Sequence, residues 1–569
     1  MGKQAREFTQ RWGISMVDRI WTQHYPEGVS PEISHDKFKT VLDIFENACR
    51  RYADRPAFSN MGCSVTYGQL DKLSADFAAY LQNHTSLKKG DRIALQMPNL
   101  IQYPIALFGA LRAGLVIVNT NPLYTAREME HQFNDAGCKA LVALANFGDL
   151  IEEVVPRTGI KHVIITQVAD MQPPVKRLLM NLIIKHVKKM VPSFNIPGAV
   201  SFTRAMSKGA ASTFDQDHRP EPDDIAVLQY TGGTTGVAKG AMLTHKNLAS
   251  NMMQFDFILR ALRPGQEIAI TPLPLYHIFS FTVNCLGLMS LGANIVLITN
   301  PRDIPGFVKE LAKWRFTTMT GLNTLFVALM NSPEFQKLDF SSLKLTIAGG
   351  MALQKNTADR WEAMTGNKIA EGFGMTETSP VVSVNPPHRI QIGTIGIPLP
   401  STDIKLVDDN ENEVPVGQSG ELCVKGPQVM KGYWQREEAT RETMTKDGQW
   451  LKTGDIALLQ EDGFLRIVDR KKDMILVSGF NVYPNEVEEV AATHPDILEC
   501  AAVGIPDEKS GEAVKLFVVK KNPDLTEQQV IEHCRTGLTG YKLPKIVEFR
   551  TDLPKTNVGK ILRRELRGK

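Results

Sequence analysis

Short runs of β-branched residues alternate with helical patterns between about residues 90 and 370. The strand-like runs are RIALQM, LVIVNT, ALVAL, HVIIT, IAVLQY, NIVLIT and LTIAGG. Between them, the spacing of apolar residues predicts a helix over 101–113, and a capping box of Thr125 and Glu128 predicts the start of another. This alternation predicts parallel sheets with helices on their faces.

The pattern changes after about residue 390. Short strands there are broken by Gly, Pro, Asp and Asn, as in KLVDDNENEVPVGQSGELCVKG, which predicts a β-barrel-like subdomain over about 390–470. Mixed helix and strand patterns begin near 473, after the charged run DRKKD. We therefore predict an α/β protein with a large N-terminal domain, residues 1–471, and a small α+β C-terminal domain, residues 472–569.

One apolar segment is long enough to span a membrane. Between Glu267 and Arg302 the chain carries no formal charge. Prolines and glycines, however, divide it into the pieces ITPLP, FTVNCLGLMS and ANIVLIT. This division is typical of a buried strand, helix and strand in an α/β domain, so we predict no span.

Composition narrows the function classes. The formal charge of +3, from 65 basic and 62 acidic residues, gives no global field for nucleic acid. Seven scattered cysteines without CxxC spacing argue against a disulfide framework or a zinc site. The first residues, MGKQAREFTQRWG, lack the apolar core of a signal peptide. These features predict a cytoplasmic protein in a reducing compartment.

The run YTGGTTGVAKG, residues 230–240, has the composition of a phosphate-binding loop. Glycines would let the backbone approach an anion, and threonines and a lysine would supply donors and charge. These residues are Thr231, Gly232, Gly233, Thr234, Thr235, Gly236 and Lys239. The run differs from the standard P-loop, because Ala238 and Gly240 stand where that pattern requires Gly and Ser or Thr. A plain Gly/Thr turn is the alternative.

A second motif, EGFGMTET, follows a predicted strand at residues 371–378. Phe373 could stack on a base, Thr376 could bind a phosphate, and Glu377 could hold magnesium, which takes carboxylate and phosphate ligands together. The alternative is a buried phenylalanine beside a helix-capping threonine.

Three more motifs follow towards the C-terminus. In WLKTGDIA, a glycine turn after a strand places Asp455, which could accept ribose hydroxyls or serve the turn itself. In DRKKDMILVSGFNVYPNEVE, Arg470 and two lysines precede an apolar strand and a turn at Ser478 and Gly479. In PKTNVGK, Lys560 lies on a short loop, where a solvated lysine is the alternative.

Together and in this order, the five motifs resemble the adenylate-forming superfamily of acyl-CoA synthetases, luciferases and peptide-synthetase adenylation domains. The resemblance covers about residues 40–569, and the runs LPLYHIF, TGLNTLF, GYWQREEAT and YKLPKIVEFR look like bacterial long-chain fatty-acid–CoA ligases. It implies activation of a fatty acid by ATP and Mg²⁺ through acyl-AMP, followed by transfer to coenzyme A.

The resemblance also implies roles for individual residues. Thr231 to Lys239 would cradle the β- and γ-phosphates, Thr376 the α-phosphate, and Glu377 the magnesium. Phe373 would stack on adenine beside Gly349 and Gly350, Asp455 and Arg470 would bind the ribose, and Lys560 would bridge the carboxylate and the α-phosphate. The C-terminal domain would rotate about Lys472, and Ser478, Gly479 and Phe480 would then line a channel for pantetheine. A solvated linker charge is the alternative for Lys472.

The charge-free segment bears on the choice of acid. It offers no acidic partner for the ammonium of an amino-acid substrate, which favours a fatty acid. By resemblance, His277 and Phe281 would lie at the entry of an acyl tunnel, and its lining would continue through Thr320, Gly321, Leu322 and Phe326. The alternative is that these residues are plain core.

A final hypothesis concerns residues 175–191, VKRLLMNLIIKHVKKMV. On a helix, one stripe would carry Arg177, Asn181, Lys185 and Lys188, and another would carry Met180, Ile183, Ile184, Val187 and Val191. A basic amphipathic helix can lie reversibly on the inner face of the cytoplasmic membrane, and docking on its own domain is the alternative. Two alternative functions stay open at this point: an acyl-AMP ligase that loads a carrier protein, and a non-catalytic acyl-binding or transport protein. A homodimer is compatible with each interpretation.

Overall fold

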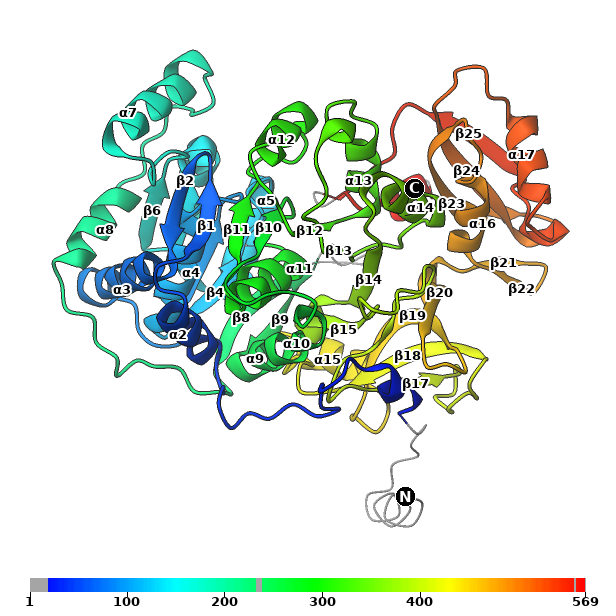
Figure 1. Ribbon diagram of the computed structural model, residues 1–569, viewed down its shortest axis with the longest axis horizontal. Coiled ribbons are helices and arrows are strands. Elements are labelled where there is room, and N and C mark those ends of the chain that lie inside the picture. The colour runs from blue at the N-terminus through cyan, green and yellow to red at the C-terminus, as the bar shows by residue number, and fades with distance from the viewer. Residues whose placement is uncertain (1–18, 232–237, 557–558, 568–569) are drawn as a thin grey trace, which may run out of the picture.

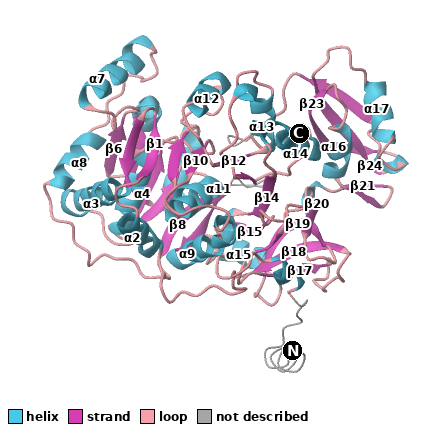
Figure 2. Cartoon of the chain, in the orientation of Figure 1, coloured by secondary structure: helices cyan, strands magenta, loops and turns pink. Residues whose placement is uncertain are grey.

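The computed structural model describes residues 19–231, 238–556 and 559–567. Within these residues, the strands form four sheets, and the largest combines the early strands β1 and β2 with the later strands β10 to β16 (Figure 1). Two large sheets with helices on their faces make up the N-terminal part, as Figure 2 shows. A smaller antiparallel sheet and a C-terminal sheet complete the molecule, so the predicted α/β class is confirmed.

The first large sheet has the order β7-β6-β5-β3-β4-β8-β9. Its strands are β3 (Arg92–Gln96), β4 (Val116–Asn119), β5 (Cys138–Leu144), β6 (His162–Thr166), β7 (Val200–Ser201), β8 (Ile225–Thr231) and β9 (Lys239–Thr244). All neighbours are parallel except the hairpin of β8 and β9. The carboxyl end of β8 therefore leads directly into the predicted phosphate loop.

The second large sheet has the order β16-β15-β14-β13-β12-β10-β11-β1-β2. Its strands are β1 (Pro56–Asn60), β2 (Cys63–Thr66), β10 (Ile268–Thr271), β11 (Asn294–Leu297), β12 (Thr318–Gly321), β13 (Leu345–Ala348), β14 (Ile369–Gly374), β15 (Val381–Val384) and β16 (Ile397–Pro398). The strands from β1 through β11, β10, β12 and β13 to β14 are parallel, and the edges are antiparallel. The run EGFG is thus the end of β14 itself, not a loop after a strand.

Helices cover these sheets and connect their strands. They are α2 (Val41–Arg51), α3 (Tyr67–His84), α4 (Gln102–Arg112), α5 (Ala126–Ala136), α6 (Gly148–Val154), α7 (Pro174–Leu182), α8 (Phe202–Ala210), α9 (His245–Gln254), α10 (Asp256–Leu259), α11 (Ile278–Ser280), α12 (Ile304–Leu311), α13 (Asn323–Met330) and α14 (Lys355–Thr365). The helix predicted over 101–113 is α4, and Thr125 caps α5 by accepting from the Glu128 amide, as predicted. One large core joins the two sheets, with Phe45 stacked on Phe108 at 3.8 Å between ring centroids.

The charge-free segment is buried within the second sheet. It contains β10, the short helix α11, a π-helix over Phe281–Leu288 and β11, which confirms its predicted division. No helix among the described residues is long and apolar enough to cross a membrane.

The antiparallel sheet runs in the order β17 (Asp403–Val407), β18 (Ser419–Lys425), β19 (Leu451–Leu459) and β20 (Leu465–Arg470). The helix α15 (Glu437–Thr443) precedes β19. The prediction that Asp455 sits in a turn is wrong, because Asp455 lies inside β19. Gly454, with φ of +72°, adopts a left-handed conformation there that favours glycine, within a register shift between β18 and β19.

The chain changes sheets after β20. A short 3₁₀ turn, Lys471–Asp473, leads into the last sheet, in which β24 (Gly511–Lys520) pairs with β21 (Ile475–Val477), β23 (Ile497–Asp507) and β25 (Ile546–Arg550). The remaining elements are β22 (Phe480–Val482), α16 (Pro484–Ala491), α17 (Glu527–Arg535) and α18 (Arg563–Leu566). This unit has its own apolar cluster, and the domain limits 1–471 and 472–569 stay a prediction.

Candidate active site

A cavity of about 1980 Å³ lies where the ends of β8, β13 and β14 face β19, β20 and the C-terminal loop. Many residues predicted from sequence line it. They are Thr231, Lys239, His277, Leu322, Gly349, Gly350, Phe373, Thr376, Glu377, Asp455, Arg470, Lys472 and Lys560. Gly232, Gly233, Thr234, Thr235 and Gly236 lie outside the described residues. The motifs, spread over more than 300 positions of the chain, therefore meet in one space.

The β8–β9 hairpin frames the phosphate loop. Thr231, the last residue of β8, pairs across the hairpin with Lys239, the first residue of β9. The Lys239 ammonium lies 5.2 Å from the centroid of the Tyr433 ring, a favourable cation–π distance. The hairpin thus holds Thr231 and Lys239 beside each other on the cavity wall.

Glu377 is held by a tyrosine that the sequence analysis did not single out. The Tyr433 hydroxyl donates to Glu377 Oε1 at 2.5 Å, and the Met430 amide donates to the Glu377 carbonyl at 2.8 Å. Burial raises the pKa of Glu377, and the Tyr433 hydrogen bond and nearby cations oppose that shift. Tyr433 belongs to the run GYWQREEAT, which contributed to the family resemblance, but no role was predicted for this residue.

Glycines leave room beside Phe373 at the end of β14. A Cβ atom on Gly349 would lie 3.3 Å from the Phe279 ring and 3.4 Å from the Gly372 carbonyl oxygen. The half-buried Phe373 follows Gly372 on the cavity wall, so a flat ring could enter between these elements. A second carboxyl that sequence reasoning missed, Glu371, accepts from the Leu353 amide at 3.0 Å, and burial raises its pKa to about 8.

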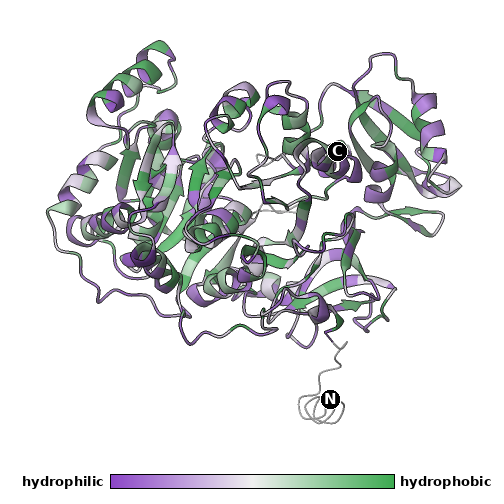
Figure 3. Cartoon of the chain, viewed as in Figure 1, coloured by the Kyte–Doolittle hydropathy of each residue, from purple (hydrophilic) through white to green (hydrophobic). Residues whose placement is uncertain are grey.

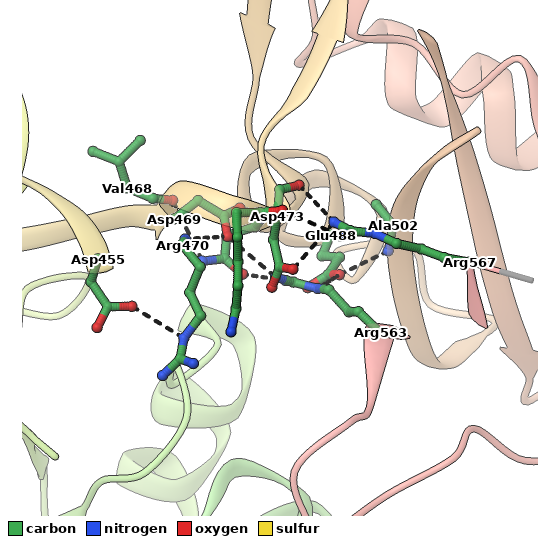
Figure 4. Close-up of polar contacts among 11 residues, drawn as sticks. Asp455, Val468, Asp469, Arg470, Asp473, Glu488, Ala502, Arg563 and Arg567 are labelled. Carbon is green, nitrogen blue, oxygen red and sulfur yellow. Dashed lines mark hydrogen bonds and ion pairs between the residues drawn. The ribbon is translucent and has the colours of Figure 1, made fainter. Parts of the chain in front are cut away.

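Asp455 and Arg470 are neighbours across β19 and β20. Arg470 Nε lies 3.2 Å from Asp455 Oδ1, as Figure 4 shows. Burial raises the pKa of Asp455, and the charges of Arg470 and Lys560 oppose that shift. Asp455 lines the same cavity as Phe373 and Thr376.

Lys560 reaches the cavity from the end of the chain. Its loop touches the large domain at Gly559, where a Cβ atom would lie 3.0 Å from Thr324 Oγ1 at the start of α13. Burial lowers the pKa of Lys560 to about 8, and the charge of Arg470 adds to the shift. Burial also lowers the pKa of His277 to about 4, with a further contribution from Lys560. Lys560 is thus half-buried on the cavity wall, unlike the freely solvated terminal lysine that was the alternative from sequence.

Ion pairs hold this C-terminal segment beside β20. Arg563 Nη2 lies 2.7 Å from Glu488 Oε2, and Arg563 Nη1 lies 3.2 Å from Asp469 Oδ1 (Figure 4). Arg567 Nη2 lies 3.2 Å from Asp473 Oδ1. The sequence analysis missed this cluster, because its members are far apart in the chain.

Not every predicted residue reaches the cavity. Ser478, Gly479 and Phe480 form the exposed β21–β22 turn away from its wall, with Phe480 stacked on Tyr541 at 4.9 Å between centroids. Lys472 lines the cavity rim, on the turn between the sheets.

Only some of the residues that were predicted to bind the acyl chain line the cavity. His277 and Leu322 line the cavity, whereas Phe281, Thr320, Gly321 and Phe326 do not. Phe326 packs instead on Trp361, at 4.7 Å between centroids, on the other side of β12. The apolar wall comes from residues that were not predicted: Phe255, Leu273, Val283, Val381 and Val384.

Comparisons with known proteins agree with this geometry. The family model of AMP-binding enzymes matches residues 45–434, and the model of their C-terminal domain matches residues 486–560. A long-chain-fatty-acid–CoA ligase of Escherichia coli O6:H1 is 57% identical over 556 residues, covering 97% of this chain and 98% of that protein. A Bacillus subtilis protein of the same name is 36% identical over 551 residues, covering 96% and 97%.

Solved structures match over nearly the whole chain. The anthranilate CoA ligase AuaEII in complex with anthranoyl-AMP has a TM-score of 0.81 at 26% identity, with 93% of this chain and 96% of that chain covered. ATP-bound MatB from Rhodopseudomonas palustris has a TM-score of 0.79 at 28% identity, with 92% and 98% covered. On these matches, the chain belongs to the family of AMP-binding enzymes.

Proposed function

We propose that this protein activates a long-chain fatty acid with ATP, forms acyl-AMP and pyrophosphate, and then transfers the acyl group to coenzyme A with release of AMP. One observation carries the proposal: a single cavity joins the phosphate and ribose motifs, an apolar wall and Lys560. The identity to long-chain-fatty-acid–CoA ligases supports the choice of acid and thiol.

In the first half-reaction, a carboxylate oxygen attacks the α-phosphorus of ATP, and the bond to the bridging oxygen of pyrophosphate breaks. Two anions must approach each other, so fixed donors and cations at the α-phosphate lower the barrier. We assign this role to Lys560 and Thr376. Thr231, Lys239 and the loop between them would hold the β- and γ-phosphates.

The nucleoside would bind at the opposite side of the same space. Phe373 would stack on adenine with Gly349 and Gly350 along its edge, because glycine leaves the gap that the ring requires. Asp455 would accept from both ribose hydroxyls, with Arg470 keeping its carboxylate oriented.

Glu377 is the residue that would hold Mg²⁺, which neutralises phosphate charge when bound. Within residues 19–231, 238–556 and 559–567, no group of three or more His, Cys, Asp or Glu side chains could hold a metal ion. One buried carboxylate that projects towards a phosphate site fits Mg²⁺, because this ion combines one or two carboxylates with substrate phosphates and water.

The second half-reaction requires a different arrangement at the same acyl-adenylate. The thiolate of coenzyme A attacks the acyl carbon, and the bond to the AMP oxygen breaks. We propose that the unit after residue 471 rotates about Lys472, withdraws Lys560 and brings Ser478, Gly479 and Phe480 to the channel. Lys472→Pro would fix φ at the hinge and should spare pyrophosphate exchange while thioester formation is lost.

The deciding experiment is ATP–pyrophosphate exchange with fatty acids of increasing length, followed by product analysis with coenzyme A. We expect exchange that depends on the fatty acid, and release of AMP and pyrophosphate. Release of ADP would contradict adenylation, and equal transfer to a carrier protein would contradict the choice of thiol. We also propose that the protein contacts a membrane surface reversibly and forms a homodimer. The exposed helical segment 174–190 supports the membrane contact.

A further inference from the structure

The helical segment 174–190 stands away from the sheets at one end of the molecule (Figure 1). It consists of α7 and a π-helix, Ile183–Val187, that continues it. None of its described residues is buried. The segment therefore adds little to the core, and its exposed surface needs another explanation.

Polar contacts fix one side of this segment to the domain. Asn181 Oδ1 accepts from the Ala169 amide at 3.1 Å, and its amide group donates to Asp170 Oδ1 at 3.3 Å. Met180 and Ile184 lie half-buried on the same side. The predicted apolar stripe is thus corrected, because these two residues face inward.

The outward face is a stripe of apolar residues at helical spacing. Its members are Val175, Leu178, Leu179, Leu182, Ile183, Val187 and Met190. Val175 and Val187 are each 74% exposed, and Figure 3 shows hydrophobic positions among hydrophilic ones along α7. Single exposed apolar residues are ordinary, but a contiguous patch of this kind marks a contact surface.

Charge identifies the kind of surface that the stripe fits. The segment 174–190 contains five lysines and arginines, and no Asp or Glu occurs between residues 171 and 214. Lys176, Lys185, Lys188 and Lys189 are exposed beside the apolar stripe. An anionic bilayer is complementary to both features, since it offers headgroup charge above hydrocarbon.

We propose that the outward face of segment 174–190 docks on anionic phospholipid and collects fatty acid from the bilayer. The apolar stripe would enter the headgroup–acyl boundary, with the lysines at phosphate level. The collection step rests on the proposed function, because only an enzyme of long-chain acids would use substrate dissolved in lipid. Docking itself does not depend on it.

The test is flotation of the full chain with vesicles of phosphatidylcholine alone or of equal parts phosphatidylcholine and phosphatidylglycerol. The triple variant Lys185→Glu, Lys188→Glu, Lys189→Glu should lower partition onto anionic vesicles by about a hundredfold or more. The variant Leu179→Ser, Leu182→Ser should lower it by about tenfold. The control is Lys309→Glu, Lys337→Glu, Lys521→Glu, which reverses exposed lysines on other elements and should bind almost as the wild type does.

A second measurement separates docking from catalysis. With dissolved fatty acid, both segment variants should form acyl-CoA at the wild-type rate, whereas with fatty acid embedded in anionic vesicles they should be slower. Wild-type binding by the lysine variant, or equal loss in the control, would overturn the docking surface. Concentration-dependent dimerisation that the leucine variant abolishes, without vesicle binding by the wild type, would assign the stripe to a second copy instead. Absence of acyl-CoA from the wild type would refute the proposed function and leave vesicle binding intact.

Discussion

The polar and the apolar ends of the cavity differ in how the chain builds them. At the polar end, Thr231, Thr376, Asp455 and Lys560 each belong to a short sequence motif. At the apolar end, Phe255 lies between α9 and α10 and Val283 lies in the π-helix Phe281–Leu288, and neither belongs to a sequence motif. Binding charge requires a few atoms in fixed places, whereas accommodating hydrocarbon requires only a wall of suitable shape. Substrate binding at the polar end should therefore be impaired by the loss of a single side-chain group. Binding at the apolar end should be impaired mainly by a change in the volume of the cavity.

The largest expected effect is at Lys560. Replacement by alanine should slow pyrophosphate exchange by about a hundredfold or more, because one cation is lost from the transition state. Supplied with acyl-AMP and coenzyme A, the variant should still form the thioester at close to the wild-type rate. Lys521→Ala, an exposed lysine in the same C-terminal unit, should change neither step. Equal damage to both steps by Lys560→Ala would show that one fixed arrangement serves both.

A bulky substitution on the cavity wall tests whether the apolar end binds the acyl chain. Val283→Trp on the wall should lower kcat/KM for the longest fatty acid relative to a short one by about thirtyfold, since each excluded methylene contributes about 0.8 kcal/mol. Phe326→Leu provides the contrast, because Phe326 packs on Trp361 away from the cavity. It should lower the free energy of unfolding by about 1–2 kcal/mol and leave the chain-length ratio unchanged. A changed ratio in Phe326→Leu would place the acyl chain on the other side of β12.

Tyr433 tests whether one hydrogen bond matters at the polar end. Tyr433→Phe should slow pyrophosphate exchange by about tenfold and raise the Mg²⁺ concentration that half-saturates it, because the phenol no longer orients Glu377. Thioester formation from supplied acyl-AMP should be unaffected. Tyr25→Phe removes a phenol that donates to the Pro398 carbonyl at 2.8 Å, and it serves as the control. An unchanged Mg²⁺ requirement in Tyr433→Phe would reduce Tyr433 to a packing role.

The pH dependence of exchange should report Lys560. Its pKa is lowered to about 8, so the lysine is charged at neutral pH and loses its proton as pH rises through that value. Exchange should therefore be constant near pH 7 and fall above about pH 8. Lys560→Arg keeps its charge and should move this decline to higher pH, even if its maximum rate is lower. A decline at the same pH in Lys560→Arg would assign the titration to another group.

The smallest effect is expected at Phe373. Stacking depends on the aromatic ring rather than on a hydroxyl group. Phe373→Tyr should change kcat/KM for ATP by less than about twofold. Phe373→Ala, which removes the ring, should raise the KM for ATP much more, and equal effects would argue against stacking.

The same contrast explains what the sequence could predict. The alternating strands, the capping box at Thr125 and the division of the charge-free segment follow from local patterns, and the structure contains them. Gly349 and Phe373 lie close together because the parallel strands β13 and β14 end at one edge of their sheet. Tyr433, Glu371 and the Arg563 cluster depend on pairing between distant segments, which periodicity does not reveal. The placement of Asp455 inside β19 shows the limit of a glycine as a turn signal.

The pairing of Asp469 bears on the proposed rotation. Its fully buried carboxylate accepts from the Asn485 amide at 2.7 Å and lies 3.2 Å from Arg563, and both partners belong to the unit that would turn about Lys472. The proposed rotation would remove both of these contacts and leave the Arg470 amide, which donates to Asp469 Oδ1 at 2.7 Å, as the remaining partner of this carboxylate. Losing the charged partner of a buried carboxylate is costly. We therefore expect the proposed rotation to take place between two discrete states. A solvent-accessible Asp469 becomes the mark of the second state.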